Sequence, residues 1–328
     1  MPRYHRQITF CARARVLVGA TVGATLVLAG CGSSNPVLLT SRVLVQHANE
    51  PVAFANDREH RLVYAERLTG SVRRLDTANR LEVQPVAVIK VSTDGQRGLL
   101  GLAVDATDRT FTASTEATAE MRIVVTQVAP GPARVVWLGP KSGARANGGH
   151  LEMSGDGRSL ILGIGEIAGR NLERIEAPPK GMSEGRMLQL DPDGLPTQTP
   201  KVLSSGWHNP FAFTVQRDGQ VWVADNAPDG VPERIARGDV GPGPTEVASL
   251  TREMIPTAIA QNSLVGFYAC FLTDSTLRRV DTTSNLPGPI VTKAPCTRAL
   301  YRSPRDGQRV VFSTEDTIYE FTDPCCRL

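Results

Sequence analysis

The sequence predicts an all-β protein, a six-bladed β-propeller with four-stranded antiparallel blades. Short runs of alternating apolar and β-branched residues flank turns rich in Asp, Asn and Gly, a pattern typical of hairpins. Such turns recur 44 to 62 residues apart, near Asp57, Asp108, Asp156, Asp218, Asn262 and Asp306. A period of roughly 40–50 residues with about four strands in each unit is the repeat of a propeller blade. Stretches with helical periodicity are nearly absent, which agrees with this fold class.

The predicted strands follow the same order in each unit. A first strand precedes the turn, at 51–56, 99–105, 150–156, 210–216, 256–261 and 297–303. A second strand follows it, at 61–67, 109–115, 159–165, 220–226, 265–271 and 309–315. Third strands are expected at 71–77, 185–191, 276–282 and 317–323, and outermost strands at 85–91 and 133–139.

The sixth unit has no evident outermost strand of its own. Residues 37–45 are rich in Val and Leu, and we expect them to return to the sixth blade and supply this strand. Such a closure removes an exposed sheet edge, where another chain would otherwise pair. We therefore expect a single propeller over residues 37–328, with the long insert at 167–185 as a surface loop.

Residues 1–30 have the features of a secretory signal: four arginines without an acidic residue, then an apolar run too short for a membrane-spanning helix. The run ends in Leu-Ala-Gly-Cys, which resembles a bacterial lipobox. We expect Cys31 to carry the lipid, residues 32–36 to form a tether, and the protein to be anchored to the cell membrane on its extracytoplasmic face. The alternative is an ordinary signal peptide followed by a chance cysteine.

The charge of the mature chain gives no indication of nucleic-acid binding. The full chain has 36 basic and 33 acidic residues, and four of the arginines lie in residues 1–30, so the remainder carries 32 against 33. A nucleic-acid-binding protein would show a basic excess. We expect a monomer whose partners are the membrane and a sugar or glycan ligand.

Four cysteines remain after the signal and Cys31 are set aside, and outside the cytoplasm they are expected to pair. They allow three pairings. A bridge between the adjacent Cys325 and Cys326 would be strained, so we expect Cys296 to join one of these two and not Cys270. No Cys or His spacing suggests zinc.

Four motifs in sequence resemble one known family. Residues 94–102 read DGQRGLLGL, 185–194 read GRMLQLDPDG, 206–210 read GWHNP, and 225–233 begin Asp-Asn-Ala-Pro and end in Glu. In this order they resemble the glucose/sorbosone dehydrogenases, six-bladed propellers that depend on pyrroloquinoline quinone (PQQ). The resemblance covers most of the mature chain.

The resemblance implies a chemistry and a set of residues for it. A histidine takes the proton of the sugar C1 hydroxyl while hydride passes to the quinone, and calcium held by loop oxygens polarises the quinone. The matching cofactor residues are Gln96, Asn209 and Arg298. The matching calcium residues are Asp225, Ala227, Pro228 and Glu233, for which a solvated acidic loop is the alternative.

The chain departs from the family pattern at the base itself. Ala146 stands at the position of the family histidine, and alanine cannot accept a proton. His150 lies four residues further on, roughly 13 Å along an extended strand. His208 replaces a family arginine beside Asn209. His150 and His208 are therefore the candidate bases, and a histidine that lines the channel or the core is the alternative for His150.

A few further positions agree with the family pattern or differ from it. Glu166 falls where family members carry an acidic residue near the base, and Cys296 replaces the first of two family arginines. The alternative role for the Gln96 amide is to stabilise a turn. Trp207 suits either a sugar face or a loop anchor.

Three functions follow from these observations. The first is a lipid-anchored, PQQ-dependent sugar dehydrogenase. The second is a non-catalytic propeller that binds a sugar, an envelope glycan or a protein. The third, a calcium-dependent lactonase, would need several convergent carboxylates, and the sequence offers no clear set.

Overall fold

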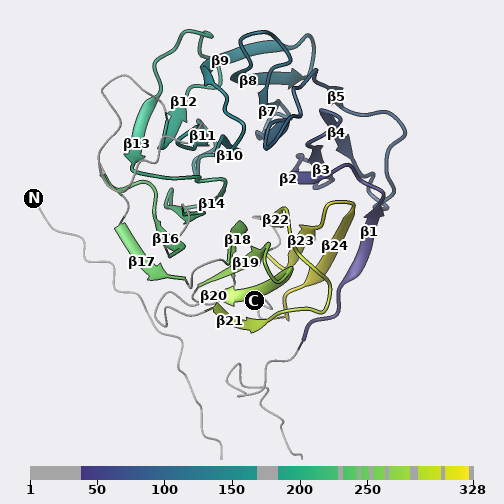
Figure 1. Ribbon diagram of the computed structural model, residues 1–328. Coiled ribbons are helices and arrows are strands. Elements are labelled where there is room, and N and C mark those ends of the chain that lie inside the picture. Colours follow the sequence, from purple (N-terminus) through teal and green to yellow (C-terminus); the bar gives the residue numbers. More distant parts are fainter. Residues whose placement is uncertain are drawn as a thin grey trace, which may run out of the picture. The chain divides into compact units, whose positions relative to one another are not determined.

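A computed structural model of the chain describes residues 38–167, 184–227, 232–241, 243, 245–250, 254–262, 266–280, 287–303 and 307–324. These residues form six four-stranded antiparallel sheets arranged as a six-bladed β-propeller (Figure 1), so the predicted fold class is confirmed. All of them belong to the unit Asn35–Leu328. None of the described segments is a helix of the length and apolarity that a membrane span needs.

The strands of each blade are consecutive in sequence except in the sixth blade. The first three blades consist of β2 (Pro51–Asn56), β3 (Leu62–Glu66), β4 (Ser71–Arg74), β5 (Ala87–Val88); β6 (Leu99–Val104), β7 (Thr110–Thr115), β8 (Arg122–Ala129), β9 (Arg134–Lys141); β10 (Gly148–Met153), β11 (Leu160–Ile164), β12 (Arg186–Leu190), β13 (Lys201–Ser205). The last three consist of β14 (Ala212–Val215), β15 (Val221–Asp225), β16 (Arg234–Arg237), β17 (Thr245–Ser249); β18 (Pro256–Gln261), β19 (Phe267–Phe271), β20 (Thr276–Val280), β21 (Pro287–Ile290); β22 (Leu300–Arg302), β23 (Arg309–Ser313), β24 (Thr317–Thr322), β1 (Arg42–Gln46).

The six first strands surround the propeller axis, because each packs against the first strands of its two neighbours. All six begin at the same end of the ring, which we call the mouth. The approach between β6 and β10 is so close that it requires glycine. A Cβ atom on Gly101 would lie 2.2 Å from the carbonyl oxygen of Gly149. The loops that precede the first strands are thereby gathered around one opening.

The ring closes through the N-terminal strand, as predicted. β1 pairs antiparallel with β24, with Val43 opposite Tyr319 and Val45 opposite Ile318. Val45 is buried among Ile318 and residues of the first and sixth blades, whereas Val43 is 46% exposed. The outermost strand of the last blade therefore comes from the start of the described chain.

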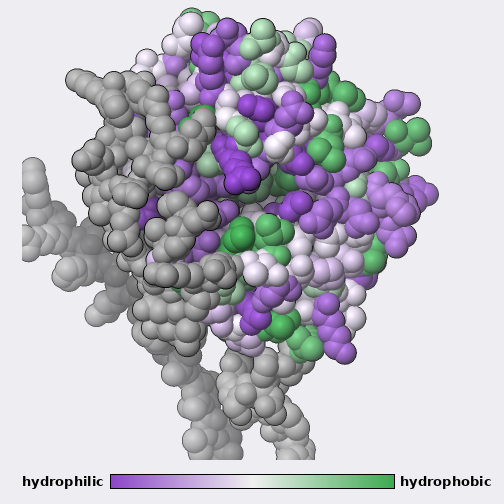
Figure 2. All heavy atoms as spheres, viewed as in Figure 1, coloured by the Kyte–Doolittle hydropathy of each residue, from purple (hydrophilic) through white to green (hydrophobic). Residues whose placement is uncertain are grey.

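The apolar core lies between neighbouring blades. One cluster joins the second and third blades, with Phe111, Ile123, Leu151, Leu162 and Leu188 among its members. Another joins the fifth and sixth, with Tyr268, Leu277, Phe312 and Phe321. On the face shown in Figure 2, apolar residues stand in small groups among hydrophilic ones.

Turn aspartates fix several hairpins at the end opposite the mouth. Asp57 Oδ1 accepts hydrogen bonds from the backbone N–H groups of Glu59 and Arg61, at 3.0 and 2.9 Å, and its Oδ2 binds Arg61 Nε at 2.7 Å. Asp105 binds the turn before β7 in the same way, through Arg109. The predicted turn residue Asp306 and most of the predicted insert 167–185 lie outside the described residues.

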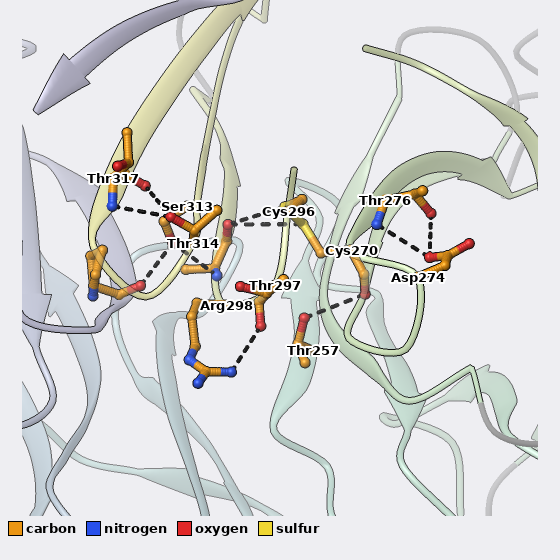
Figure 3. Close-up of a disulfide and its surroundings, with 12 residues drawn as sticks. Thr257, Cys270, Asp274, Thr276, Cys296, Thr297, Arg298, Ser313, Thr314 and Thr317 are labelled. Atoms are coloured by element: carbon orange, nitrogen blue, oxygen red, sulfur yellow. Dashed lines mark hydrogen bonds between the residues drawn. A yellow bond between two sulfur atoms is a disulfide. The ribbon is translucent and has the colours of Figure 1, made fainter. Parts of the chain in front are cut away.

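The disulfide prediction was wrong. Cys270 of β19 is bonded to Cys296, with the Cα atoms 5.2 Å apart (Figure 3). Cys296 lies in the loop before β22, and its N–H donates to the carbonyl oxygen of Ser275 at 2.9 Å, which places this loop against the fifth blade. Contact between neighbouring blades thus selects the pairing, which sequence spacing does not reveal. Cys325 and Cys326 lie outside the described residues.

Candidate functional site

Three loops at the mouth are joined by side-chain amides. Gln96, in the loop before β6, accepts the N–H of Ala146 on its Oε1 at 2.7 Å. Asn209, in the loop before β14, accepts the N–H of Gly148 on its Oδ1 at 3.1 Å. Two of the predicted cofactor residues therefore meet on the loop that enters β10.

These contacts determine which amide atoms remain available. A backbone N–H is a donor, so the oxygen of each amide must face it and the NH₂ group must face away. Among the described residues, neither the NH₂ of Gln96 nor that of Asn209 has a hydrogen-bond partner. Gln96 is exposed and Asn209 half-buried. The mouth thus offers two oriented donors to a ligand rich in oxygen acceptors.

Ala146 occupies the centre of this arrangement, where the family pattern has a histidine. It is 7% exposed and adopts a left-handed backbone with φ of 51°. Its carbonyl oxygen accepts the N–H of Ile167 at 3.2 Å, and Ile167 is also left-handed, with φ of 45°. Strained backbone of this kind is concentrated at functional sites. The methyl group of Ala146 supplies no proton acceptor there.

Asp225, at the end of β15, organises the adjacent loop. It is 1% exposed, and its carboxylate accepts the N–H of Asn209 at 2.9 Å and that of His208 at 3.2 Å. Arg234, the residue opposite it on β16, binds the same carboxylate at 2.7 Å and the carbonyl oxygen of Gly206 at 2.6 Å. The structure therefore shows Asp225 in a scaffold that holds His208 and Asn209.

His208 is held between two blades. Its Nε2 lies 3.0 Å from Oε1 of Glu166, which follows β11, and Glu166 is 3% exposed. Its Nδ1 contacts the carbonyl oxygen of Asn226. Glu166 N–H in turn donates to the carbonyl oxygen of His208 at 2.9 Å. The imidazole keeps 21% of its side-chain surface exposed, so it is within reach of a ligand in the mouth.

His150 has different surroundings. It lies within β10, with its ring edge-on to Phe213 at 4.6 Å between centroids, and its Nε2 is 3.2 Å from Oε1 of Glu152. The other oxygen of Glu152 accepts the N–H of Val215 on β14 at 2.8 Å. His150 therefore packs between the first strands of the third and fourth blades, and its ring also lies edge-on to Phe211, in the loop of Asn209, at 6.1 Å between centroids.

Arg298 stands across the mouth on the loop before β22. Its guanidinium lies 3.1 Å from Glu315 and 3.6 Å from Glu50. Burial acts to raise the pKa of Glu50, but the hydrogen bond and charge of Arg67, together with the charge of Arg298, hold that pKa below its ordinary value. Arg67 also donates to the carbonyl oxygen of Gly95 at 3.0 Å. This chain of contacts places Arg298 at the same end of the ring as Gln96.

The described members of the predicted calcium set do not form a metal site by themselves. Asp225 is occupied as above, and Glu233 Oε2 accepts the N–H of Ala227 at 2.6 Å. Pro228 lies outside the described residues. In the described part of the chain, no three His, Cys, Asp or Glu residues form a group that fits a metal ion. No step of the proposed chemistry therefore involves calcium.

Glu233 is a buried carboxyl group that should make stability depend on pH. It is 3% exposed, and burial, aided by the nearby charge of Asp225, raises its pKa from 4.5 to about 7. The folded state then binds a proton more tightly than the unfolded state. The contribution of Glu233 to the free energy of unfolding is therefore complete below pH 4.5. This contribution is lost as the pH rises to about 7, and the loss is at most about 3 kcal/mol.

Replacing Glu233 by Gln should remove this dependence, because the amide keeps an acceptor for Ala227 N–H and carries no charge. We expect the variant to be more stable than the wild type at pH 8 and similar to it at pH 4.5. Urea unfolding across this range measures the difference. Glu59→Gln is the control, since Glu59 is 51% exposed. Parallel stability curves for wild type and Glu233→Gln would contradict the assignment.

Sequence reasoning missed the supporting residues of this site. Arg234 was not among the predicted site residues. It lies opposite Asp225 in the paired strands and is therefore the partner of that carboxylate. The pairing register of β15 and β16 would have identified Arg234, but the long loop between these strands prevents the register from being predicted from the sequence. Trp207 proved to be an anchor: it is 1% exposed, its Nε1 donates to Ser204 Oγ at 2.9 Å, and Arg234 lies over its ring.

The fold and the mouth define a class: six-bladed propellers whose ligand site is built from the loops entering the first strands. The family model described as glucose / sorbosone dehydrogenase matches residues 48–235, and the chain belongs to this family. The resemblance seen in the motifs is thereby confirmed. A comparison with curated protein sequences gave no match.

Solved structures of similar fold include dehydrogenases from two bacteria. The PQQ-bound aldose sugar dehydrogenase of Streptomyces coelicolor is 20% identical, with a TM-score of 0.69 over 86% of this chain and 98% of that one. The soluble aldose sugar dehydrogenase of Escherichia coli, in its apo form, is 16% identical, with a TM-score of 0.68 over 87% and 99%. A calcium structure of a Trichoderma reesei family AA12 enzyme is 13% identical, with a TM-score of 0.65 over 88% and 99%. At these identities the likeness concerns the fold.

Proposed function

We propose that this protein is a lipid-anchored sugar dehydrogenase of the PQQ class, which oxidises a sugar at its C1 hydroxyl by hydride transfer to the quinone. The observation that carries the proposal is the pair of outward NH₂ groups on Gln96 and Asn209. Their oxygens are held by backbone N–H groups, so both donors are oriented before a ligand arrives. Preorganised donors bind without the cost of ordering them.

The donor set suits the chemistry of PQQ, a planar quinone with carboxylate groups. The amides of Gln96 and Asn209 would donate to its oxygens, and Arg298 would face a carboxylate from the opposite side of the mouth, although Glu50 and Glu315 share its charge. When bound, PQQ supplies the two-electron acceptor. The chain's own task is to orient the sugar and to receive the hydroxyl proton.

One observation favours a second candidate, a propeller that binds a ligand without turnover. Ala146 places a methyl group where the family pattern has the base. A site that keeps its donors but lacks an acceptor for the proton would bind and not react. The two candidates predict the same ligand affinity and differ in turnover.

The experiment titrates the purified mature protein with PQQ, followed by fluorescence, and then measures dye reduction with aldoses. We expect binding and sugar-dependent reduction. Gln96→Glu keeps the acceptor for Ala146 N–H and replaces the outward NH₂ by an anionic oxygen, so PQQ affinity should fall at least about tenfold, or about 1.4 kcal/mol. Gln84→Glu, the same change at an exposed glutamine before β5, is the matched control.

The possible results separate the candidates. Absence of PQQ binding to the wild type contradicts the proposed function. Binding without dye reduction supports the second candidate. Equal affinities of the Gln96 and Gln84 variants would remove the amides from the cofactor site.

The membrane anchor is a separate part of the proposal and rests on the Leu-Ala-Gly-Cys sequence ending at Cys31, which lies outside the described residues. We expect the membrane-extracted protein to begin at Cys31 and to carry the mass of attached acyl chains. Cys31→Ser should release the protein from the membrane fraction. A membrane form that starts elsewhere, or lacks the added mass, contradicts lipidation.

A further inference from the structure

Glu315 is a half-exposed carboxylate that contacts Arg298 at the mouth. It lies in the turn between β23 and β24, and its Oε1 is 3.1 Å from Nη2 of Arg298. Its Oε2 accepts the hydroxyl of Thr297 at 3.1 Å. The side chain of Glu315 is 50% exposed, whereas that of Arg298 is 24% exposed. Glu315 is thus the more solvent-exposed member of this ion pair.

The position of Arg298 is fixed by its loop. Cys296, two residues earlier, is bonded to Cys270 of the fifth blade. The N–H groups of Thr297 and Arg298 donate to the carbonyl oxygen of Ser313 at 2.9 and 3.1 Å. The guanidinium also donates from Nη1 to the carbonyl oxygen of Thr297 at 3.2 Å (Figure 3). Arg298 is therefore held through both its backbone and its side chain.

The second carboxylate near Arg298, that of Glu50, is bound to another arginine. Its two oxygens accept Nε and Nη2 of Arg67 at 2.6 and 3.0 Å, whereas Nε of Arg298 is 3.6 Å away. That Nε is buried and has no hydrogen-bond partner in the described part of the chain. Glu50 is 18% exposed, and its left-handed backbone, with φ of 51°, donates its N–H to the carbonyl oxygen of Glu315 at 2.8 Å. Glu50 is therefore the fixed carboxylate of the two, and Glu315 is the one that can turn away.

The charges of this cluster balance. Two arginines, Arg67 and Arg298, face two glutamates, Glu50 and Glu315, so the formal charges cancel. A carboxylate ligand at Arg298 would add an uncompensated negative charge as long as Glu315 stayed in place, and like charges at such distances repel. An exposed ion pair is among the weakest contacts in a protein, so Glu315 can turn into water at little cost.

We propose that Glu315 is a displaceable counter-ion of Arg298, which holds the place of a ligand carboxylate and yields it when the ligand binds. The inference rests on the proposed function, in which Arg298 faces a carboxylate of PQQ. Glu315 then makes the mouth selective. A neutral ligand does not compete for the guanidinium, whereas a ligand with several carboxylates does. Glu50 stays with Arg67 and keeps its charge beside Arg298 throughout.

Removing the charge of Glu315 should strengthen binding, which is the opposite of what the loss of a binding residue does. Glu315→Gln keeps an oxygen for the hydroxyl of Thr297 but forms no ion pair with Arg298. We expect its PQQ affinity, measured by fluorescence titration, to be about two- to fivefold higher than that of the wild type. Glu59→Gln is the matched control. Glu59 is 51% exposed and lies 3.4 Å from Arg61 at the opposite end of the ring. Because solvent screens a charge at that distance from the mouth, this change should alter the affinity by less than about 1.5-fold.

A second pair of variants separates competition for Arg298 from simple repulsion of the ligand. Arg298→Gln should weaken PQQ binding by at least about tenfold, since it loses a charge-assisted hydrogen bond. In this background Glu315→Gln should change the affinity by less than about 1.5-fold, because no guanidinium is left to compete for. The urea unfolding midpoint of each variant shows that it is folded.

A ligand without a quinone tests the inference apart from the cofactor. Benzenetricarboxylate, followed by titration calorimetry, should bind Glu315→Gln about two- to fivefold more tightly than the wild type. Equal or weaker binding by Glu315→Gln overturns the inference, as does an equal gain in Glu59→Gln or a full gain in the Arg298→Gln background. Absence of PQQ binding to the wild type, with the tricarboxylate gain retained, overturns the proposed function alone. Absence of binding of both ligands overturns both.

Discussion

A charge at Val45 should open the propeller. Val45→Asp places a carboxylate at a position that is 7% exposed in β1, beside Ile318 of β24. No cationic partner for it is seen among the described residues of this cluster, and a buried unpaired charge is among the most destabilising changes known. We expect a loss of about 3–5 kcal/mol in the free energy of unfolding, measured with urea.

The same strand provides the control. A register shift in the pairing with β24 separates Val43 from Val45. Val43 is 46% exposed, so Val43→Asp should cost less than about 0.5 kcal/mol. A chain that begins at His47 should lose more stability than Val45→Asp, because it lacks the whole of β1 and exposes the edge of β24. We expect it to aggregate, as an unpaired edge strand does. A monodisperse, cooperatively melting truncated chain would show that β1 does not close the ring.

Loss of the Asp225 carboxylate should be the most damaging single change at the mouth. Asp225→Ala leaves the guanidinium of Arg234 and the N–H groups of His208 and Asn209 without their acceptor. The side chain of Arg234 is 26% exposed, so the main cost is the loss of the buried acceptor of these donors, and we expect a loss of about 2–3 kcal/mol in the free energy of unfolding. Urea unfolding at pH 7 measures this loss.

Two further variants make the test specific. Asp218→Ala removes an exposed turn carboxylate that binds a single N–H, that of Gln220, and should cost about 1 kcal/mol or less. Arg234→Met in the Asp225→Ala background removes the uncompensated charge and should recover part of the stability. Equal losses from Asp225→Ala and Asp218→Ala would mean that Asp225 does not organise the loop.

Much of the fold could be predicted because each strand is specified locally. The stretches 51–56 and 256–261 were predicted to the residue as β2 and β18, since turn residues limit alternating apolar runs at both ends. The third strand of the second blade, β8 (Arg122–Ala129), and that of the fourth, β16, were not predicted. Neither is preceded by a short turn signal, so the repeat alone did not reveal them.

The candidate site was predictable as a list of positions and not as a set of contacts. Gln96, Asn209 and Arg298 were identified from motifs, and the structure places all three at the mouth. Their partners, among them Ala146 and Glu50, come from other blades. Asp225 was expected to hold a metal, yet the structure shows it binding Arg234. The difference arises because a carboxylate in a sequence has the same appearance whether its partner is a cation of the chain or an ion.

The class of fold, the closure of the ring and the family could all be predicted from the amino-acid sequence. The alternation of apolar and polar residues, the turn residues and the order of the motifs are local features of the sequence. They can be recognised without knowing which distant residues are in contact. Three contacts became known from the three-dimensional arrangement: Cys270 pairs with Cys296, Asp225 holds the loop of His208, and His208 contacts Glu166. Each of these contacts joins residues from different strands or blades, and their proximity is created by the packing of blades around the axis.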